Sequence, residues 1–405
     1  MGFSNKVKVI ALAAGLSMAG VSQAQSPKPV NIGVMTDMSG LYSQIGGRGS
    51  VVAAQMAVDD FGGKIFGRPI KVLSADHLNK PDVAAARARE WVDRDGVVMM
   101  TDVLGSATGL AVQNLLAEKD FVIMNTGTAT SAITNKNCSP YSTHWSYDTQ
   151  AIAASSATAT LAEQGDSWYF ITADYAFGHM LQADSTKVLL KGGGKVVGTV
   201  KHPLNSGDFS SYILQAQASG AKVIVLANTG GDATNALRQA KEFGVIDAGQ
   251  KVVPLLIFDS DIKALGLDAV QGVKYTTGFY WDFDDRTREW SKRFFAKHNA
   301  QASMVQAATY SATLNYLKAA KAVGGFDRDK VMAKLRETPV DDMFARNATL
   351  RDDGLLVHDM YMAQVKRPSE SKSEWDIAKV IKVISGKDAF APISESECPY
   401  LKNKS

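Results

Sequence analysis

The chain has 405 residues, of which 45% are hydrophobic and 21% are charged, and it carries 44 Lys and Arg against 41 Asp and Glu. This length exceeds what one hydrophobic core usually holds and predicts at least two lobes. The composition excludes a disordered, collagen-like or polytopic membrane chain, and the small formal net charge of +3 argues against a nucleic-acid partner.

The first residues are typical of a secretory signal. Lys6 and Lys8 precede an apolar run over 9–21, and small residues follow at Ser22 and Ala24. The run is too short for the roughly 20 residues of a spanning helix, although a membrane anchor is the alternative. We therefore expect a signal peptide over 1–24, cleaved after Ala24, and a soluble exported product, most simply in a bacterial periplasm.

Export changes the interpretation of the two cysteines, Cys138 and Cys398. In an oxidising compartment two lone cysteines favour a disulfide, and two buried thiols are the alternative. A bridge would tie the C-terminal tail back onto the first lobe.

Strand and helix patterns alternate along the chain, starting near residue 30 and again near 168. Short apolar, β-branched runs predict strands buried on both faces, and the helical patterns between them predict βαβ units with parallel sheets. We expect strands at 30–36, 70–75, 97–101, 121–125, 168–173, 196–200, 223–227 and 252–258. Helices are expected at 50–61, 82–94, 108–118, 149–164, 178–191, 209–219 and 232–243.

The alternation of strands and helices is interrupted in two places. The segment 139–147 is polar and aromatic and connects the two predicted sheets, and two long helices at 286–299 and 304–323 precede late strands at 361–365 and 377–383. A chain that completes neither lobe in one pass predicts several crossings between lobes, and such crossings form a hinge beside a ligand cleft.

The sequence lacks the common local signatures of enzymes. The chain has no H-E-x-x-H, G-x-S-x-G or P-loop motif, and its six histidines are scattered. The glycine clusters at 47–49 and 192–194 lack the third glycine of a dinucleotide loop, and the acidic run 282–285 is better explained as a helix start than as a cation site. We expect no cofactor, no metal and no catalytic residue.

Loops that follow the predicted strands are rich in glycine and hydroxyl residues, at 37–42, 104–108, 126–130 and 228–232. Hydroxyls together with free amides at helix N-termini suit a carboxylate, and plain N-capping is the alternative. Asp174 and Asp259 each follow a strand and are candidates for pairing with a ligand ammonium, or for capping. Aromatic residues that suit the wall of a pocket, or core packing, occur in the same loops: Tyr42, Trp145, Tyr147, Tyr175, Phe177, Tyr280 and Trp281.

Several segments together resemble one family. Gly33–Gly40 and Ala57–Ile70 look like the opening of the leucine/isoleucine/valine-binding proteins of ABC importers, and the likeness continues to about Val383. Other matching stretches are Gly105–Thr108, Thr172–Gly178, Asp208–Ser211 and Leu237–Ala240.

The resemblance implies a type I periplasmic binding fold, with two Rossmann-like lobes joined by a three-strand hinge. It implies a first lobe of residues 29–146 with 279–352, a second lobe of 147–278 with 353–385, and a tail of 386–405. It also implies a ligand carboxylate held by two first-lobe loops, an aromatic cover and an acid for the amino group. The ligand residues expected are Tyr42, Gly105, Ser106, Thr108, Gly127, Thr128, Tyr175, Phe177, Thr229, Asp259 and Tyr280.

The chain departs from the family at the residues that recognise the α-amino part of an amino-acid ligand. Ile45 replaces a common aromatic, Ala129 replaces a frequent Thr, and the loop 228–231 lacks aromatics. We expect a monomeric solute-binding protein that delivers a small carboxylate to an inner-membrane ABC permease. The ligand is an amino acid or an aromatic or 2-oxo acid. The alternatives are a periplasmic sensor that reports to a receptor and, with no motif behind it, a hydrolase or lyase.

Overall fold

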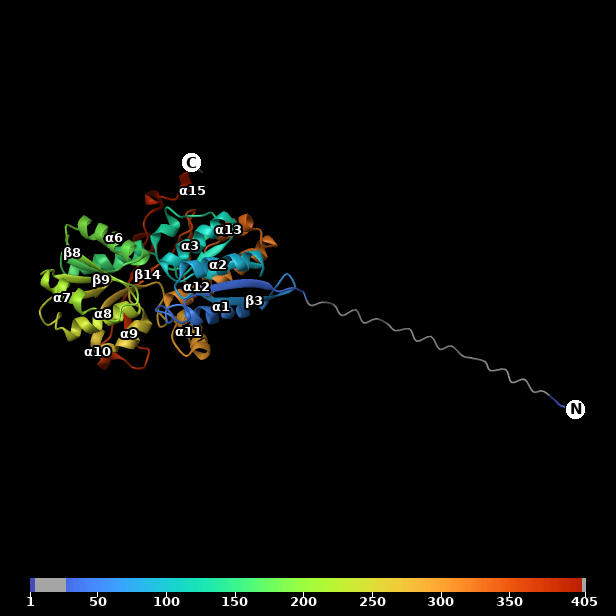
Figure 1. Ribbon diagram of the computed structural model, residues 1–405, viewed down its shortest axis with the longest axis horizontal. Coiled ribbons are helices and arrows are strands. Elements are labelled where there is room, and N and C mark those ends of the chain that lie inside the picture. The colour runs from blue at the N-terminus through green and yellow to red at the C-terminus, as the bar shows by residue number, and fades with distance from the viewer. Residues whose placement is uncertain (4–26, 403–405) are drawn as a thin grey trace.

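The structure, a computed structural model, describes residues 1–3 and 27–402, so the expected signal peptide lies almost entirely outside the described residues. Two α/β bodies lie side by side, and the strand β14 lies between them in Figure 1. We call the body around the first sheet of the chain the first lobe and the other the second lobe. The predicted α/β class with two parallel-sheet lobes is confirmed.

The first lobe is built on a six-stranded sheet in the order β2-β3-β1-β4-β5-β6, parallel except where β2 meets β3. The central strand β1 is apolar along most of its length because neighbours flank it and helices cover both faces. The strands are β1 (Val30–Thr36), β2 (Lys64–Ile65), β3 (Arg68–Asp76), β4 (Val97–Asp102), β5 (Ile123–Asn125) and β6 (Ser142–His144).

Helices from both parts of the chain cover this sheet. The longest, α12, begins with a capping box in which Ser303 and Gln306 satisfy each other's backbone amides, and most of its length is buried. The helices of the first lobe are α1 (Gly47–Phe61), α2 (Pro81–Asp93), α3 (Ser106–Glu118), the short 3₁₀ turn η1 (Ser131–Thr134), α11 (Asp285–His298), α12 (Met304–Val323) and α13 (Arg328–Glu337).

The second lobe contains a four-stranded parallel sheet in the order β10-β9-β7-β8, with β7 (Ser167–Ala173), β8 (Lys195–His202), β9 (Val223–Ala227) and β10 (Lys251–Pro254). The strand predicted over 252–258 is shorter than expected, because the chain leaves the sheet at Pro254 and runs buried to Phe258. The helix predicted over 149–164 contains a π turn, η2 (Ala153–Ala157), between α4 (Thr149–Ile152) and α5 (Thr158–Gln164). The other helices are α6 (Ala176–Lys191), α7 (Ser210–Ala218), α8 (Gly231–Glu242), α9 (Asp259–Leu265) and α10 (Leu267–Val270).

Two antiparallel sheets complete the fold. β11 (Lys274–Thr277), β14 (Met360–Val365) and β15 (Ala378–Ile384) form one beside the second lobe, and β12 (Thr349–Leu350) pairs with β13 (Leu356–Val357). The short strands β2, β6, β11, β12 and β13 were not predicted, since runs of two to four residues carry too little periodicity. The short turns are η3 (Pro368–Glu370), η4 (Ile393–Glu395), α14 (Gly386–Ala389) and α15 (Pro399–Lys402).

Three segments carry the chain between the lobes, and they contact one another. They leave β6, β11 and β13, and His358 from the third forms a 2.5 Å hydrogen bond through Nε2 with the carbonyl oxygen of Ser146 from the first. Gly278 from the second segment is packed so closely that an added Cβ would lie 3.2 Å from the His358 ring. The lobes are thus joined by three chain segments in one place.

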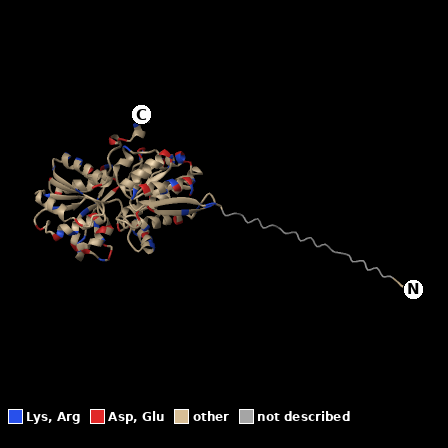
Figure 2. Cartoon of the chain, viewed as in Figure 1, with Lys and Arg blue, Asp and Glu red and all other residues tan. Residues whose placement is uncertain are grey.

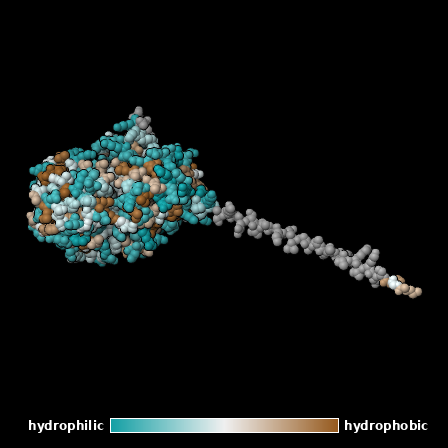
Figure 3. All heavy atoms as spheres, viewed as in Figure 1, coloured by the Kyte–Doolittle hydropathy of each residue, from teal (hydrophilic) through white to brown (hydrophobic). Residues whose placement is uncertain are grey.

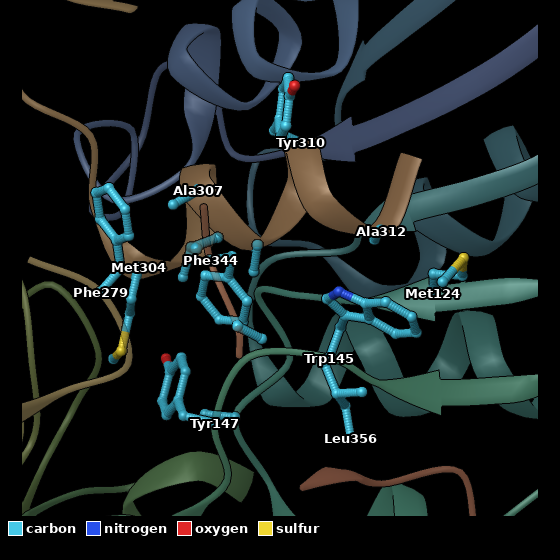
Figure 4. Close-up of a cluster of buried hydrophobic side chains, with 14 of the residues drawn as sticks. Met124, Trp145, Tyr147, Phe279, Met304, Ala307, Tyr310, Ala312, Phe344 and Leu356 are labelled. Carbon is cyan, nitrogen blue, oxygen red and sulfur yellow. The ribbon is translucent and has the colours of Figure 1, made fainter. Parts of the chain in front are cut away.

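An apolar cluster fixes the first segment against the first lobe. Figure 4 shows Trp145 beside Met124 and below Ala312, in the middle of α12, with Tyr147 below Phe344. The Trp145 indole donates a 3.0 Å hydrogen bond to Ser311 of α12, so this buried ring has a polar partner. The first connecting segment is therefore firmly packed against the first lobe at its start.

The surface shows no large field of one sign in the view of Figure 2, where charges of both signs are spread over both lobes. Figure 3 shows a mostly hydrophilic face with scattered apolar residues. In the part of the chain that the structure describes, no helix combines the length and apolar character needed to cross a bilayer.

Candidate ligand-binding site

A small cavity of about 20 Å³ lies between the two lobes. Its walls come from loops that follow β1, β4 and β5 in the first lobe and β7, β9 and β10 in the second, together with the first connecting segment. Such loops meet at the carboxyl ends of parallel strands, which is where α/β proteins bind ligands. The lining residues are Tyr42, Ile45, Leu104, Gly105, Ser106, Gly127, Ala129, Tyr147, Tyr175, Phe177, Thr229 and Phe258.

Three helices begin at this cavity without a side-chain cap. They are α3, which starts after Gly105, α6, which starts after Tyr175, and α8, which starts after Gly230. The first amides of a helix have no partner within it, and the helix dipole adds partial positive charge there. Three such ends, from both lobes, make the surroundings of the cavity favourable for an anion.

Glycine is required at Gly105, the residue before α3. Its φ is +94°, and an added Cβ would lie 2.5 Å from the Asn79 side-chain oxygen and 2.9 Å from the Thr108 hydroxyl. Without a side chain here, the backbone at the start of α3 reaches the cavity directly.

Two hydroxyl groups, one from each lobe, are available to a ligand. The Ser106 oxygen accepts a 3.1 Å hydrogen bond from the Thr130 amide, which leaves its own proton to donate. Thr229 is only 6% exposed, and its Oγ1 has no hydrogen-bond partner among the described residues. Buried hydroxyls are rarely left unpaired, so Thr229 indicates a place for a ligand acceptor.

The lobes are closed over the cavity. The hydroxyls of Tyr42 and Tyr175 hydrogen bond to each other across the opening, and Leu41 packs on Gly231 at the start of α8. Burial raises the pKa of both phenols, so both groups stay protonated and neutral.

Aromatic and aliphatic side chains form the rest of the wall. Tyr147 meets Phe258 edge to face, with ring centroids 6.2 Å apart, and Tyr175 lies beside Phe177 at 6.0 Å. Ile45, Leu104 and Ala129 complete the apolar surface. The cavity therefore offers hydroxyls and helix ends for an anionic group, and rings for an apolar body.

Of the residues expected from sequence, Tyr42, Gly105, Ser106, Gly127, Tyr175, Phe177 and Thr229 line this cavity. Two expected hydroxyl residues do not line it. Thr108 donates to the carbonyl oxygens of Leu104 and Gly105 at 2.6 and 2.7 Å, and Thr128 donates to that of Val103 at 2.6 Å. Both stabilise the loops that carry their neighbours.

Asp259 and Tyr280 also lie outside the cavity wall. Asp259 accepts a 2.6 Å hydrogen bond from the Tyr275 hydroxyl, and Tyr280 donates to the carbonyl oxygen of Ala378 at 2.7 Å. Burial raises the pKa of Asp259 to about 6, and the Tyr275 hydrogen bond opposes that shift. Asp174, the other acid considered from sequence, is exposed and pairs with His179 at 2.7 Å.

Leu104 and Phe258 line the cavity although sequence reasoning did not select them. Apolar side chains at strand ends are indistinguishable from core residues in a single sequence. Tyr147 belonged to the aromatic group noted from sequence, and its place beside β6 is what brings it to the cavity.

A buried carboxyl lies directly behind the first-lobe loops. Asp102, at the end of β4, is fully buried, and an added Cβ on Gly127 would lie 2.3 Å from its Oδ1. Burial raises the pKa of Asp102 to about 7, against the lowering effect of the Thr36 and Ser50 hydroxyls. This acid does not line the cavity, but it lies close enough to respond to charge there.

A larger depression of about 250 Å³ lies on the second lobe beneath α5 and β11. It is open to solvent and crossed by the Lys274–Glu163 ion pair, whose shortest N–O distance is 2.6 Å. Because every buried helix end and unpaired hydroxyl described above lies at the interlobe cavity, we assign the ligand site there. Within residues 1–3 and 27–402, no group of three or more His, Cys, Asp or Glu is placed to hold a metal.

The C-terminal tail returns to the first lobe. Beyond β15 it passes the lobe connection, where Phe390 meets His358 edge to face, and Ser396 then donates to the carbonyl oxygen of Thr134. Cys398 forms a disulfide with Cys138, which confirms the predicted bridge. Figure 1 shows the last helix, α15, above the first lobe near α3.

Comparison with known proteins agrees with this geometry. A crystal structure of a periplasmic binding protein from Burkholderia mallei is 47% identical, covers 92% of this chain and 99% of its own, and superposes with a TM-score of 0.90. A branched chain amino acid ABC transporter periplasmic ligand-binding protein from Burkholderia xenovorans is 43% identical, with coverage of 91% and 99% and a TM-score of 0.81.

A more distant curated relative is the Leu/Ile/Val-binding protein homolog 6 of Brucella abortus, 24% identical over 272 residues, which are 65% of this chain and 68% of the relative. The family model described as "Periplasmic binding protein" matches residues 29–372. The two lobes, the interlobe cavity and this match together show that the chain belongs to the periplasmic binding protein family.

Proposed function

We propose that this protein is the exported solute-binding component of an ABC importer of the branched-chain amino acid type, and that it captures a small carboxylate between its lobes. One observation carries the proposal: three uncapped helix ends and the unpaired Thr229 hydroxyl surround the interlobe cavity. The Burkholderia xenovorans relative, 43% identical, is a branched chain amino acid ABC transporter periplasmic ligand-binding protein.

The mechanism is binding and closure without covalent chemistry. The ligand carboxylate accepts hydrogen bonds from Ser106 and the first amides of α3 on one lobe, and from Thr229 on the other. Because these donors come from both lobes, the ligand stabilises the closed state, and the Tyr42–Tyr175 hydrogen bond adds to it. The closed surface is then the form that an inner-membrane permease recognises.

The three segments that meet at His358 and Ser146 act in this proposal as the hinge. The lobes correspond to residues 29–146 with 279–352 and 147–278 with 353–385. The hairpin of β12 and β13 spans the boundary near 352 and touches β6 through Leu355. We also propose that Tyr42, Gly105, Gly127, Tyr175 and Phe177 form the remaining ligand contacts.

The test uses mature protein that has been unfolded and refolded to remove carried ligand, screened by thermal shift against small carboxylates. A ligand at 100 times its Kd adds about 2.7 kcal/mol to the free energy of unfolding and raises the Tm by a few degrees. We expect Thr229→Val and Ser106→Ala each to weaken binding about tenfold or more, since each removes a hydrogen bond to a charged group. Thr199→Val, at an exposed position on β8, is the matched control. No shift with any carboxylate would overturn the proposal.

Export and transport are tested separately. N-terminal sequencing of the protein from a periplasmic extract should begin at Gln25, because cleavage is expected after Ala24. Deletion of the gene for this chain should abolish uptake of the ligand if the protein serves an importer, whereas deletion of a sensor would leave uptake intact and remove a downstream response.

A further inference from the structure

Uncharged groups make up the whole wall of the interlobe cavity. Within the described chain, each lining residue is aromatic, aliphatic, a hydroxyl residue or glycine. The helix ends at the edge of the cavity contribute positive partial charge, because α3, α6 and α8 all begin there. The nearby carboxyls, whose charge reaches Tyr42, Tyr147 and Tyr175, lie outside the wall. This arrangement favours a negative group and opposes a positive one.

The acids near the cavity already have partners within the protein. Asp259 accepts from the Tyr275 hydroxyl at 2.6 Å, and Asp232 accepts from the backbone amides of Asn205 and Ser206 at 3.1 and 2.8 Å. Asp37 accepts from the amide of Tyr42 at 3.0 Å and from that of Gly40 at 2.7 Å. Phe258, the residue before Asp259, is the part of that loop that reaches the cavity.

Asp102 is the remaining acid, and the protein backbone separates it from the cavity. It lies behind Gly127 and Leu104, which themselves form the wall. A ligand amine would have to displace one of these backbone segments to reach the carboxyl.

We propose that this cavity selects a monocarboxylate with a compact, uncharged apolar or aromatic body and rejects the α-ammonium group of an amino acid. This inference rests on the proposed function and narrows its ligand class. A buried ammonium without a facing carboxylate loses its hydration with no compensating ion pair, and three helix N-termini repel it. The same ends stabilise the carboxylate.

The size of the cavity agrees with a small ligand body. Its volume of about 20 Å³ is close to the roughly 10–15 Å³ that one water molecule needs, so the lobes must open slightly around a ligand, which favours a small body. Phe177 and Phe258 of the second lobe and Ile45 and Leu104 of the first give the body apolar contacts from both sides.

The test compares amino acids with the 2-oxo acids that carry a carbonyl oxygen in place of the α-ammonium group, and adds benzoate as an aromatic carboxylate. The refolded, ligand-free protein is titrated calorimetrically with leucine and 4-methyl-2-oxopentanoate, with phenylalanine and phenylpyruvate, and with benzoate. We expect at least one amine-free carboxylate to bind about a hundredfold more tightly than any of the amino acids. An amino acid that binds within tenfold of the best amine-free carboxylate, or more tightly, overturns this inference and leaves the proposed function intact. If no carboxylate binds, the proposed function fails instead.

A pair of variants supplies a second readout. Asp259→Asn should change the Kd of the best amine-free carboxylate by less than about twofold, whereas Ser106→Ala should weaken it about tenfold or more. An Asp259→Asn variant that selectively loses affinity for leucine would show that Asp259 holds an ammonium and would contradict the inference. The titrations of the unmodified protein decide the question even if either variant fails to fold.

Discussion

The hydroxyl of Tyr42 in the first lobe hydrogen bonds to the hydroxyl of Tyr175 in the second, at the edge of the interlobe cavity. Tyr42 reaches this position from the loop after β1, and Tyr175 is the residue from which α6 begins. Both rings also line the cavity. One side-chain pair thus links ligand contact to lobe closure.

Tyr175→Phe should speed ligand dissociation about threefold to tenfold, because a hydrogen bond that stabilises the closed state is worth about 1 kcal/mol. The association rate should change less, since the open lobes do not form this bond. Stopped-flow measurement of tryptophan fluorescence during ligand displacement gives both rates. Tyr316→Phe, which loses a 2.9 Å hydrogen bond to the Val98 carbonyl within the first lobe, is the control. Equal dissociation rates in the two variants would contradict the role in closure.

The buried carboxyl of Asp102 should make the stability of the folded protein depend on pH in an unusual way. Burial raises its pKa to about 7 in the folded protein, against 3.8 for the ordinary side chain, and the nearby Asp37 adds to that rise. The folded state therefore binds a proton that the unfolded state has released between about pH 4 and 7. This contribution to stability is present at low pH and is lost as the pH rises through 7.

Asp102→Asn should accordingly raise the free energy of unfolding at pH 8, by about 1–3 kcal/mol, and the gain should shrink at pH 5. Denaturant unfolding at the two pH values measures the difference. The exposed acid Asp247 supplies a matched substitution, Asp247→Asn, which should show no such pH-dependent gain. A gain of equal size at both pH values would mean that packing, not charge, is responsible.

The Cys138–Cys398 disulfide should stabilise the protein and hold the tail, which also meets the first lobe through hydrogen bonds from Ser396 to Thr134 and from Glu397 to Asn135. Replacing both cysteines with serine should lower the free energy of unfolding by about 2–4 kcal/mol and expose residues beyond Ala391 to proteolysis. Ligand affinity should change little, since none of the described tail residues, 386–402, lines the cavity. Limited proteolysis followed by mass spectrometry locates the cuts. Reduction of the unmodified protein should reproduce the pattern, and a tail that stays protected would refute this role.

The layout of the fold could be predicted because its central elements have strong local patterns. The runs 30–36 and 223–227 are almost continuously apolar, and both proved to be central strands with the predicted limits. Helix α12 also has its predicted limits, since Ser303 caps its start and Gly324 ends it with a positive φ. The short strand β6 was missed because its residues Ser142–His144 become a strand only through pairing with β5.

The site could be predicted only in part, for a different reason. Glycine and hydroxyl residues after a strand indicate a binding loop, which selected Ser106 and Thr229. The same signal selected Thr128, whose hydroxyl turns toward the Val103 carbonyl instead. A single sequence does not show which way a side chain points. It also does not show a partner that is distant in the chain, such as Tyr275 for Asp259.

Gly178, which follows Phe177 in the sequence, lies where close packing leaves no room for a side chain. It lies in the first turn of α6, and an added Cβ would come within 2.1 Å of the Ala173 backbone oxygen. Since Ala173 ends β7, even a methyl group must push α6 away from the sheet end that carries Tyr175 and Phe177. This close approach is a physical reason for glycine after Phe177.

Gly178→Ala should therefore lower the free energy of unfolding by about 2 kcal/mol or more and weaken ligand binding as well. Gly207→Ala is the matched control, because an added Cβ there meets no atom within 4 Å. Thermal unfolding measures the first effect and calorimetric titration the second. If Gly178→Ala binds ligand normally, α6 can shift without moving its first turn, and the close packing at Ala173 does not position the cavity wall.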